Sequence, residues 1–270
     1  MKTKATIIAL LLTITICSVW AGWFLTIENP DNVMGVNASF IMGVNISTGG
    51  STPVAGNKTI SEDFSTDLSA YYRFDTDGAI IDQVIGNNGT INGATYTASG
   101  KINGGYIFDG TNDKITIPDD NWFNGDFTFA MWVYPDTKTN DDRIMTQGIT
   151  GNLAYLRYQT SFNGIRFALV GSDGAALLDA PNTYVLNAWQ YLLVTRSGND
   201  YELFINNVSV ATHTVDIGTY NPTVDVTLGQ RGDTTRLFNG TMDEVGVWSR
   251  ALNESQIQDI YNNGSGIPYN

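Results

Sequence analysis

The sequence predicts an all-β protein: a two-sheet antiparallel sandwich with a short C-terminal helix, preceded by one hydrophobic N-terminal helix. The composition favours strands, because it includes 13 Tyr, 12 Phe and 6 Trp, while 28 Gly can supply turns. Short apolar segments separated by turn residues recur from about residue 66 onward, and residues 5–27 carry no charge. A single sandwich of about 200 residues is an ordinary domain size.

The clearest strand pattern lies near the C-terminus, in the first half of residues 237–261. Met242 and Glu244 fall on one face of the expected strand, and Asp243 and Val245 fall on the other. Such a strand must pack against an earlier one, and residues 68–75 are the expected partner.

A short helix is expected directly after this strand. Asn253 can cap its N-terminus, with Gln256 as the capping-box partner three residues later. Leu252 can pack on Ile257 as a hydrophobic staple, and Gly264 is the expected end of the helix.

Strand patterns also fill the middle of the chain. Alternate residues from 127 to 133 are apolar, and Trp132 and Tyr134 lie opposite them, so this strand is expected to be covered on both sides. Residues 191–195 and 201–205 predict a hairpin, with Asn206 and Asn207 as the tight turn that follows. Residues 165–170 and 226–228 predict further strands.

Several motifs follow one another in a fixed order: residues 68–75 with Asp82 and 86–90, then 106–115, 126–133 and 238–252. Residues 189–195 and 203–206 add a central hairpin. In this order the motifs resemble the laminin-G-like (concanavalin-A-like) jelly-roll domains, over about residues 66–262. The resemblance implies a jelly-roll topology. It does not imply one ligand, because this fold hosts lectins, enzymes and protein binders alike.

The chain is predicted to divide into residues 1–27, 28–65, 66–264 and a tail at 265–270. Lys2 and Lys4 precede the uncharged residues 5–27, which are long enough to span a bilayer as a helix and would place the C-terminal domain outside. An uncleaved membrane anchor is expected. The alternatives are a signal peptide cleaved after Ala21 and the class III signal of archaeal pilin-like proteins, which Lys4-Ala5 resembles.

Residues 28–65 predict a stalk rich in Asn, Ser, Thr and Gly, with a short tandem repeat at 33–39 and 41–47. Triplets for N-glycosylation are candidates for modification, although an Asn- and Thr-rich chain also generates such triplets by chance. They begin at Asn37, Asn45, Asn57, Asn88, Asn207 and Asn239, and further ones at Asn253 and Asn263.

The charge balance argues against nucleic-acid binding. The net charge is −13, with 14 Lys and Arg against 27 Asp and Glu, so no basic face is expected. Cys17 is the single cysteine, which excludes an intrachain disulfide.

Aspartates cluster in the motifs and are candidates for a structural Ca²⁺ site, since calcium takes six to eight oxygen ligands. If the first and last strands of the sandwich pair, Asp75 and Asp243 come close together, where a cation would relieve their repulsion. The resemblance to calcium-carrying laminin-G-like domains implies the same. The candidate ligands are Asp75, Asp82, Asp109 and Asp243.

Aromatic residues near an arginine are candidates for a sugar platform, because rings stack on sugars and guanidinium groups donate to hydroxyls. Ordinary packing is the alternative for the same side chains. The candidates are Trp122, Tyr155, Arg157 and Tyr158.

Catalysis is not expected. Related concanavalin-A-like glucanases carry Glu-x-Asp-x-Glu on one strand, and none of the five glutamates of this chain lies four residues from another. His213 is the single histidine, so a zinc site or a Ser-His triad lacks its parts.

These observations predict a non-catalytic recognition and adhesion module at a cell or virion surface, binding a glycan or a surface glycoprotein. The alternative is a structural subunit of a surface filament or coat, which would self-associate through residues 5–27. A polysaccharide hydrolase is a third, less favoured hypothesis.

Overall fold

The computed structural model describes residues 15–19, 22–26, 62–118, 120–139, 141–233 and 235–268. The chain separates into two units, residues 1–56 and 57–270. In the first unit, β1 (Thr15–Val19) and β2 (Gly22–Thr26) pair as antiparallel strands.

The helix predicted for residues 5–27 is not shown, because the described residues of this stretch form β1 and β2. Thr15, Ile16 and Val19 are β-branched, and such residues favour strands over helices, which accounts for the difference. The rest of this stretch lies outside the described residues, as do residues 28–61 of the predicted stalk with Asn37, Asn45 and Asn57.

Among the described residues, no helix combines the length and the apolar character needed to cross a bilayer.

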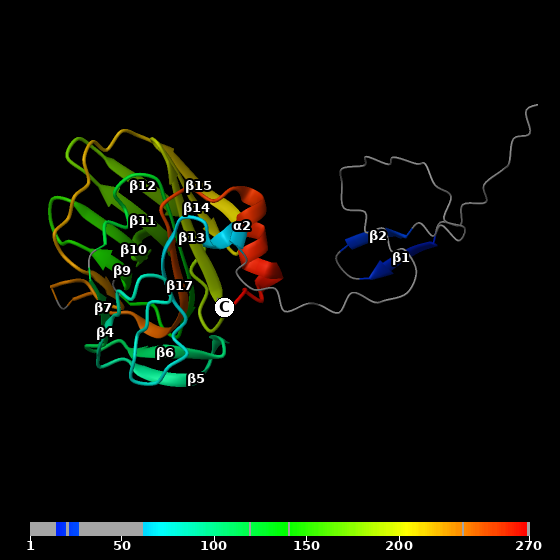
Figure 1. The fold of residues 1–270 in the computed structure, drawn as a ribbon, viewed down its shortest axis with the longest axis horizontal. Helices are drawn as coiled ribbons and strands as arrows, with labels where there is room; N and C mark the ends of the chain where they lie inside the picture. Colours follow the sequence, from blue (N-terminus) through cyan, green and yellow to red (C-terminus); the bar gives the residue numbers. More distant parts are fainter. Residues whose placement is uncertain are drawn as a thin grey trace, which may run out of the picture. The chain divides into compact units, whose positions relative to one another are not determined.

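The second unit contains the predicted two-sheet antiparallel sandwich (Figure 1). The seven-stranded sheet has the order β12 (Ala175–Ala180), β11 (Gly164–Val170), β10 (Leu153–Gln159), β9 (Arg143–Gln147), β16 (Val226–Leu228), β7 (Lys114–Ile117) and β4 (Thr90–Asn92).

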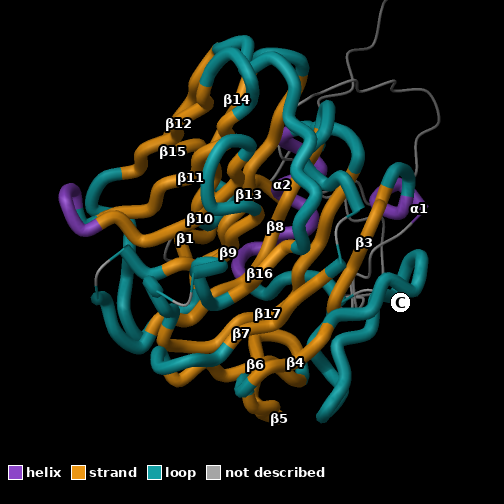
Figure 2. Tube along the Cα trace, turned by 90° about the vertical axis from the view of Figure 1, so that its left-hand side faces the viewer, coloured by secondary structure: helices purple, strands orange, loops and turns teal. Residues whose placement is uncertain are grey.

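The second sheet has the order β15 (Val208–Thr214), β14 (Asp200–Ile205), β13 (Gln190–Ser197), β8 (Phe127–Pro135), β17 (Asn239–Trp248), β6 (Gly104–Asp109) and β5 (Thr95–Ile102). Its eighth strand, β3 (Leu68–Tyr72), pairs with β17, so the predicted pairing of the first and last strands of the sandwich is confirmed. Strands make up most of the sandwich, and the helices are short (Figure 2).

The main core lies between the two sheets, and β8 shows how the sequence builds it. Phe127, Phe129 and Met131 point into this core, whereas Ala130 and Trp132 point to the opposite face of the strand. The predicted burial of both faces of β8 is therefore confirmed. Burial of about 150–250 Å² per aromatic side chain makes such residues the largest contributors to the core.

A second cluster covers the outer face of the eight-stranded sheet. There α2 (Glu254–Tyr261) packs on β8 and β13, and Tyr261 stacks on Trp132 with ring centroids 5.8 Å apart. Phe64 of α1 (Glu62–Ser65) and Ile267 join this cluster, so the packed unit extends a few residues beyond the predicted bounds 66–264 at both ends.

The predicted cap of α2 is confirmed, since Asn253 and Gln256 form a capping box, and the stapling residues Leu252 and Ile257 are both buried in the outer cluster. The helix ends earlier than predicted. Asn262 takes the left-handed conformation after Tyr261, and Gly264 lies in the following 3-10 turn, η2 (Asn262–Gly264).

The alternation predicted for β17 is wrong at one point. Met242 and Val245 both face the main core instead of opposite faces. The pairing of β17 with β8 shifts between Asp243 and Gly246, and Glu244 has a φ of 49°. This bulge inserts an extra residue and reverses the phase of the strand, which buries Asp243 and Glu244 together.

Candidate functional site

The outer face of the seven-stranded sheet gathers polar side chains in two parallel rows. On β10, Ala154, Leu156 and Tyr158 belong to the main core, so Tyr155 and Arg157 point outward. Cross-strand register then places each row: one passes through Tyr155 and the other through Arg157. On β10 the two rows lie about 7 Å apart along the strand, the spacing of residues i and i+2.

The threonine row consists of residues directly opposite one another on β4, β7, β16 and β9, and it ends at Tyr155 on β10. Its members are Thr90, Thr116, Thr227 and Thr146. Thr146 is 2% exposed, and among the described residues its hydroxyl oxygen has no hydrogen-bond partner. A buried hydroxyl without a partner costs free energy, so a ligand that bonds to it gains affinity.

A groove of about 600 Å³ runs over this row, and we call it the threonine groove. Thr116, Thr146 and Thr227 form its floor, and Asn152 and Asn221 are in its walls. Ile149, which is 40% exposed, adds an apolar surface. The lining therefore offers both donors and acceptors beside an apolar patch.

The arginine row crosses β9, β10 and β11. Arg143 lies opposite Arg157, and Arg157 lies opposite Arg166. Arg166 pairs with Asp179 of β12 at 2.5 Å, and Arg157 pairs with Asp141 at 2.8 Å. The guanidinium carbon of Arg143 lies 4.0 Å from the centre of the Tyr155 ring.

Burial and like charge act together on this row. Burial, followed by the charges of Arg157, Arg236 and Arg231, lowers the pKa of Arg143 to about 9. Burial also lowers the pKa of Arg157, although Tyr155 and Asp141 oppose the shift. The lowered pKa of Arg143 still lies above neutral pH, so this side chain remains a cation.

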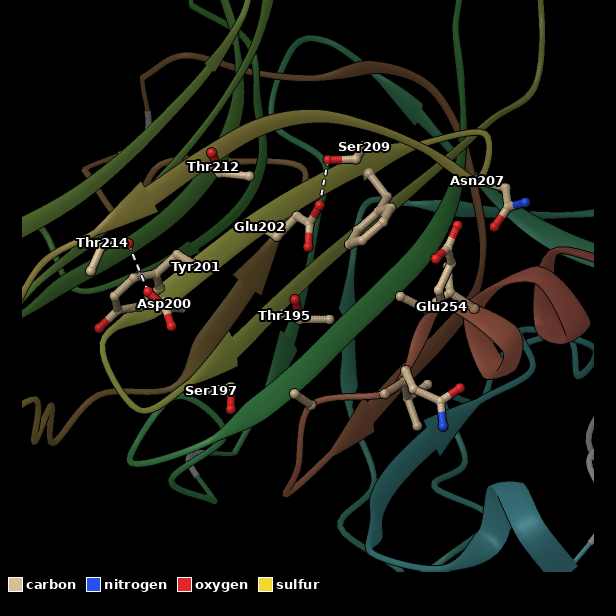
Figure 3. A pocket seen from close by; sticks show the side chains of 15 residues that line it. Thr195, Ser197, Asp200, Tyr201, Glu202, Asn207, Ser209, Thr212, Thr214 and Glu254 are labelled. Carbon is tan, nitrogen blue, oxygen red and sulfur yellow. Dashed lines mark hydrogen bonds between the residues drawn. The ribbon is translucent and has the colours of Figure 1, made fainter.

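A second groove, of about 590 Å³, lies on the other sheet between β13–β15 and the start of α2, and we call it the α2 groove (Figure 3). Glu202 and Glu254 enter it from the strands and from the helix respectively. Glu202 accepts a hydrogen bond from Ser209, and Asp200 accepts one from Thr214 at 2.6 Å. Two of the carboxylates in the α2 groove are thus hydrogen-bonded to neighbouring hydroxyl groups.

Comparison with known proteins identifies the family. A laminin-G-type profile of the concanavalin A-like lectin/glucanases superfamily matches residues 109–258, which is more than half of the chain. The chain belongs to the concanavalin A-like lectin/glucanases superfamily. The laminin-G-like resemblance and its all-β sandwich are therefore confirmed.

Solved structures of low sequence identity share the superfamily fold. Domain 4 of the extracellular arabinanase AbnA from Geobacillus stearothermophilus, solved in complex with arabinotriose, superposes with a TM-score of 0.61 at 22% identity, covering 72% of this chain and 97% of that domain. The binding domain of Paraclostridial Mosquitocidal Protein 1 gives a TM-score of 0.58 at 15% identity, covering 74% of this chain and 52% of that one. Trypanosoma rangeli sialidase in complex with the inhibitor DANA gives 0.56 at 16% identity, covering 74% of this chain and 33% of that one.

A curated relative also matches part of the chain. The Adhesion G-protein coupled receptor V1 of Danio rerio is 22% identical over 146 residues. The match covers 50% of this chain and 2% of the receptor.

Two of the four residues predicted to form a sugar platform lie on the outer face of the seven-stranded sheet. Tyr155 and Arg157 do so: the guanidinium groups of Arg143 and Arg157 both lie over the Tyr155 ring, at the end of the threonine row. Trp122 and Tyr158 are each 4% exposed and belong to the main core, so their proposed role in stacking on a sugar is corrected. Tyr158 alternates inward on β10, and Trp122 packs against Tyr72 and neighbouring core rings.

Two of the four aspartates predicted to bind calcium, Asp82 and Asp109, accept backbone N–H groups, most of them from their own loops. Asp82 accepts four backbone N–H groups, from Tyr71, Val84, Ile85 and Asn87, at 3.0–3.1 Å. Asp109 accepts the N–H of Thr111 in a tight turn.

Asp75 and Asp243 do lie within electrostatic reach of each other, as predicted, but Asp75 pairs with Arg73 at 2.7 Å and Asp243 accepts the N–H of Ile102 at 2.8 Å. Across the described part of the chain, no group of three or more His, Cys, Asp or Glu residues is placed to hold a metal ion. Calcium binding by these aspartates stays a prediction. A melting temperature that falls in EDTA would support it.

The glycosylation candidates within the described residues differ in exposure and in their hydrogen bonds. Asn88 is exposed, and its side-chain oxygen accepts the N–H of Asp82. Asn239 donates its side-chain amide to the carbonyl of Asp109, and Asn207 lies half-buried in the turn after β14. Glycosylation stays a prediction at these positions.

The bulge in β17 creates a buried acidic pair. The hydroxyl of Tyr71 donates to Glu244 at 2.5 Å, and the N–H of Glu244 donates to Asp243 at 2.8 Å. Burial raises the pKa of both carboxyl groups well above their usual values, and their mutual repulsion raises that of Glu244 further. The cavity beside Glu244 is about 10 Å³, which is room for one water and not for a sugar.

Sequence reasoning missed Arg143 and the threonine row. Each strand shows only one or two of these residues, for example Arg143 and Thr146 in β9 or Thr227 in β16. Alternation does not reveal the pair in β9, because Arg143 and Thr146 are three residues apart and a register shift against β10 brings both to the outer face. Only the cross-strand register brings them together.

Proposed function

We propose that this chain is a non-catalytic recognition module that binds a glycan in the threonine groove. The observation that carries the proposal is the floor of aligned hydroxyls at Thr116, Thr227 and Thr146, in a groove of about 600 Å³ on the outer face of a sheet. Membership of a superfamily of lectins and glucanases supports it, as does a neighbour solved with arabinotriose bound.

The chemistry of the groove suits a saccharide. Each sugar hydroxyl both donates and accepts, and threonine hydroxyls and asparagine amides can match both roles. Asn152 and Asn221 supply amides in the walls. Ile149 offers an exposed apolar side chain to the C–H face of a sugar ring. Discrimination is then strong, because a groove hydroxyl left unpaired by the wrong ligand costs affinity.

The proposal includes a surface setting and an adhesive role, in line with the sequence-based expectation of a membrane-anchored module outside the cell or virion. The partial match to an adhesion receptor supports adhesion. A non-catalytic role is proposed because the glucanase pattern Glu-x-Asp-x-Glu does not occur in the sequence. Release of reducing sugar from a polysaccharide panel would contradict it.

The test combines a glycan array with matched variants of the full chain. The double substitution Thr146→Val and Thr227→Val removes two hydroxyls while it keeps the side-chain shape and the β propensity. We expect affinity for the array-selected saccharide to fall at least about tenfold, since each lost hydrogen bond is worth about 1 kcal/mol.

The control is Thr195→Val with Thr212→Val, because these threonines face one another across Glu202 in the α2 groove. This control should keep full affinity. A ligand that is lost in the control and retained in the first variant would place the site in the α2 groove instead.

A further inference from the structure

Arginines concentrate around the arginine row more than anywhere else in this acidic chain. Five of the eight arginines in the sequence influence one another there. They are Arg143, Arg157, Arg166, Arg231 and Arg236, and we call them the arginine cluster. Since the chain carries a net charge of −13, such a concentration is opposite to the overall balance.

The acids around the cluster do not neutralise it. Asp141 is shared between Arg157, at 2.8 Å, and Arg236, at 2.9 Å. Arg166 pairs with Asp179, and Arg231 pairs with Asp233 at 3.3 Å. Three carboxylates therefore serve four arginines, and the fifth arginine, Arg143, pairs with none of them.

Arg143 is the member of the arginine cluster that none of these three carboxylates pairs with. Its side chain is 5% exposed, and its Nε and Nη1 atoms have no hydrogen-bond partner within the described residues. The next residue in sequence does not serve it, because Asp142 accepts hydrogen bonds from Thr139 instead. The Tyr155 ring offers Arg143 a cation–π contact, which does not satisfy N–H donors.

This arrangement is costly unless an anion completes it. Like charges directly opposite one another in a sheet are destabilising, and a buried guanidinium without hydrogen bonds loses its hydration without replacement. The planar fork of an arginine matches the two oxygens of a carboxylate, and such bidentate pairs are among the strongest hydrogen-bonded contacts.

Solvent reaches the cluster beside Arg236. A hollow of about 590 Å³ is lined by Thr139, Asp141 and Arg236, whose side chain is 35% exposed. The N–H of Arg143 donates to the carbonyl of Arg236 at 3.1 Å, so the backbones of the two arginines are joined beside this hollow.

We propose that the arginine cluster binds the carboxylate of an acidic saccharide, with Arg236 contacting it from the solvent side and Arg143 from below. The inference rests on the proposed function, because the cluster adjoins the threonine groove through Tyr155 and the two would hold one ligand. A single carboxylate on an otherwise neutral sugar fits better than a polyanion, which the net charge of −13 repels.

The test measures thermal stabilisation of the full chain by sodium glucuronate, with glucose and with sodium chloride at equal ionic strength as matched solutes. A ligand that binds the folded state raises the melting temperature with its concentration. We expect glucuronate to bind at least about tenfold more tightly than glucose, the contribution of one charge-assisted pair.

The deciding variant is Arg143→Met, which keeps the length and bulk of the side chain but removes the charge. Its melting temperature without ligand should be equal to or above that of the wild type, because an unpaired buried charge is lost. The preference for glucuronate over glucose should disappear. Arg196→Met is the control, since Arg196 also lies over a tyrosine ring, that of Tyr201, but on the other sheet. This control should keep the preference.

Each outcome separates the two proposals. The carboxylate site is overturned if glucuronate stabilises the chain no more than sodium chloride does. It is also overturned if glucuronate stabilises Arg143→Met as much as the wild type. Either result leaves neutral-glycan binding in the threonine groove intact. Glucuronate stabilisation that needs Arg143, together with array binding that ignores Thr146→Val and Thr227→Val, would keep the carboxylate site and remove the proposed function.

Discussion

Replacing Asp82 by alanine is expected to lower the melting temperature by about 10 °C. The carboxylate of Asp82 accepts the N–H groups of Tyr71, Val84, Ile85 and Asn87 and is 4% exposed. Alanine leaves these four donors without an acceptor. With partial rehydration of the loop we expect a loss of about 3 kcal/mol, which corresponds to that shift in a domain of this size.

Asp77→Ala is the matched control, because Asp77 is an exposed aspartate in the same connection between β3 and β4. Calorimetry of both variants should show a large shift for Asp82→Ala and almost none for Asp77→Ala. Equal melting temperatures for the two variants would mean that Asp82 does not hold this connection to β3. Because Asp82 was a candidate calcium ligand, repeating the melts in EDTA also tests that prediction.

Stability is expected to fall as the pH rises from about 5 to 8, because of the acidic pair in β17. Burial raises the folded-state pKa of Asp243 and of Glu244 above their ordinary values of 3.8 and 4.5. The folded state then keeps a proton that the unfolded state releases. The stabilisation is complete below the unfolded pKa and is lost as pH rises toward the folded one, at about 1.4 kcal/mol per pH unit for one retained proton.

Glu244→Gln should flatten this dependence, since glutamine accepts the Tyr71 hydroxyl without carrying a charge. Urea unfolding at pH 5, 6.5 and 8 would show that the free energy of unfolding of the variant increases relative to that of the wild type as the pH rises. Glu254→Gln, at an exposed position in the first turn of α2, should keep the wild-type slope. A wild-type stability that rises across this range, or equal slopes in all three proteins, would contradict a protonated pair.

Local patterns predicted the fold well wherever local chemistry decides it. The alternation of Phe127, Phe129 and Met131 placed β8 between two covered faces, and Asn253 with Gln256 fixed the start of α2. Asn206 and Asn207 both take positive φ, of 51° and 65°, as a tight turn requires.

Sequence patterns failed where one inserted residue reverses the alternation of a strand. They also failed where the strand propensity of β-branched residues competes with a long uncharged, apolar stretch. The bulge at Asp243 and Glu244 leaves no mark on the alternation of β17, yet it reverses which side chains are buried. At Thr15–Val19 an uncharged stretch suggested a helix, and β-branched residues favoured a strand.

The candidate site was only half predictable, for a related reason. Tyr155 and Arg157 were found from one segment, because they stand two residues apart on β10. Their partners come from other strands: Arg143 and Thr146 from the preceding strand β9, and Thr227 from β16, which is distant in sequence. Cross-strand register is a property of the whole sheet, so no single segment could reveal the rows.

The most direct test of glycan binding in the threonine groove is amide chemical-shift mapping with the saccharide that the array selects. The account predicts that the largest shifts fall on β7, β9 and β16, around Thr116, Thr146 and Thr227, and extend to Tyr155. Shifts confined to β13–β15 and the start of α2, with the threonine row unmoved, would contradict it.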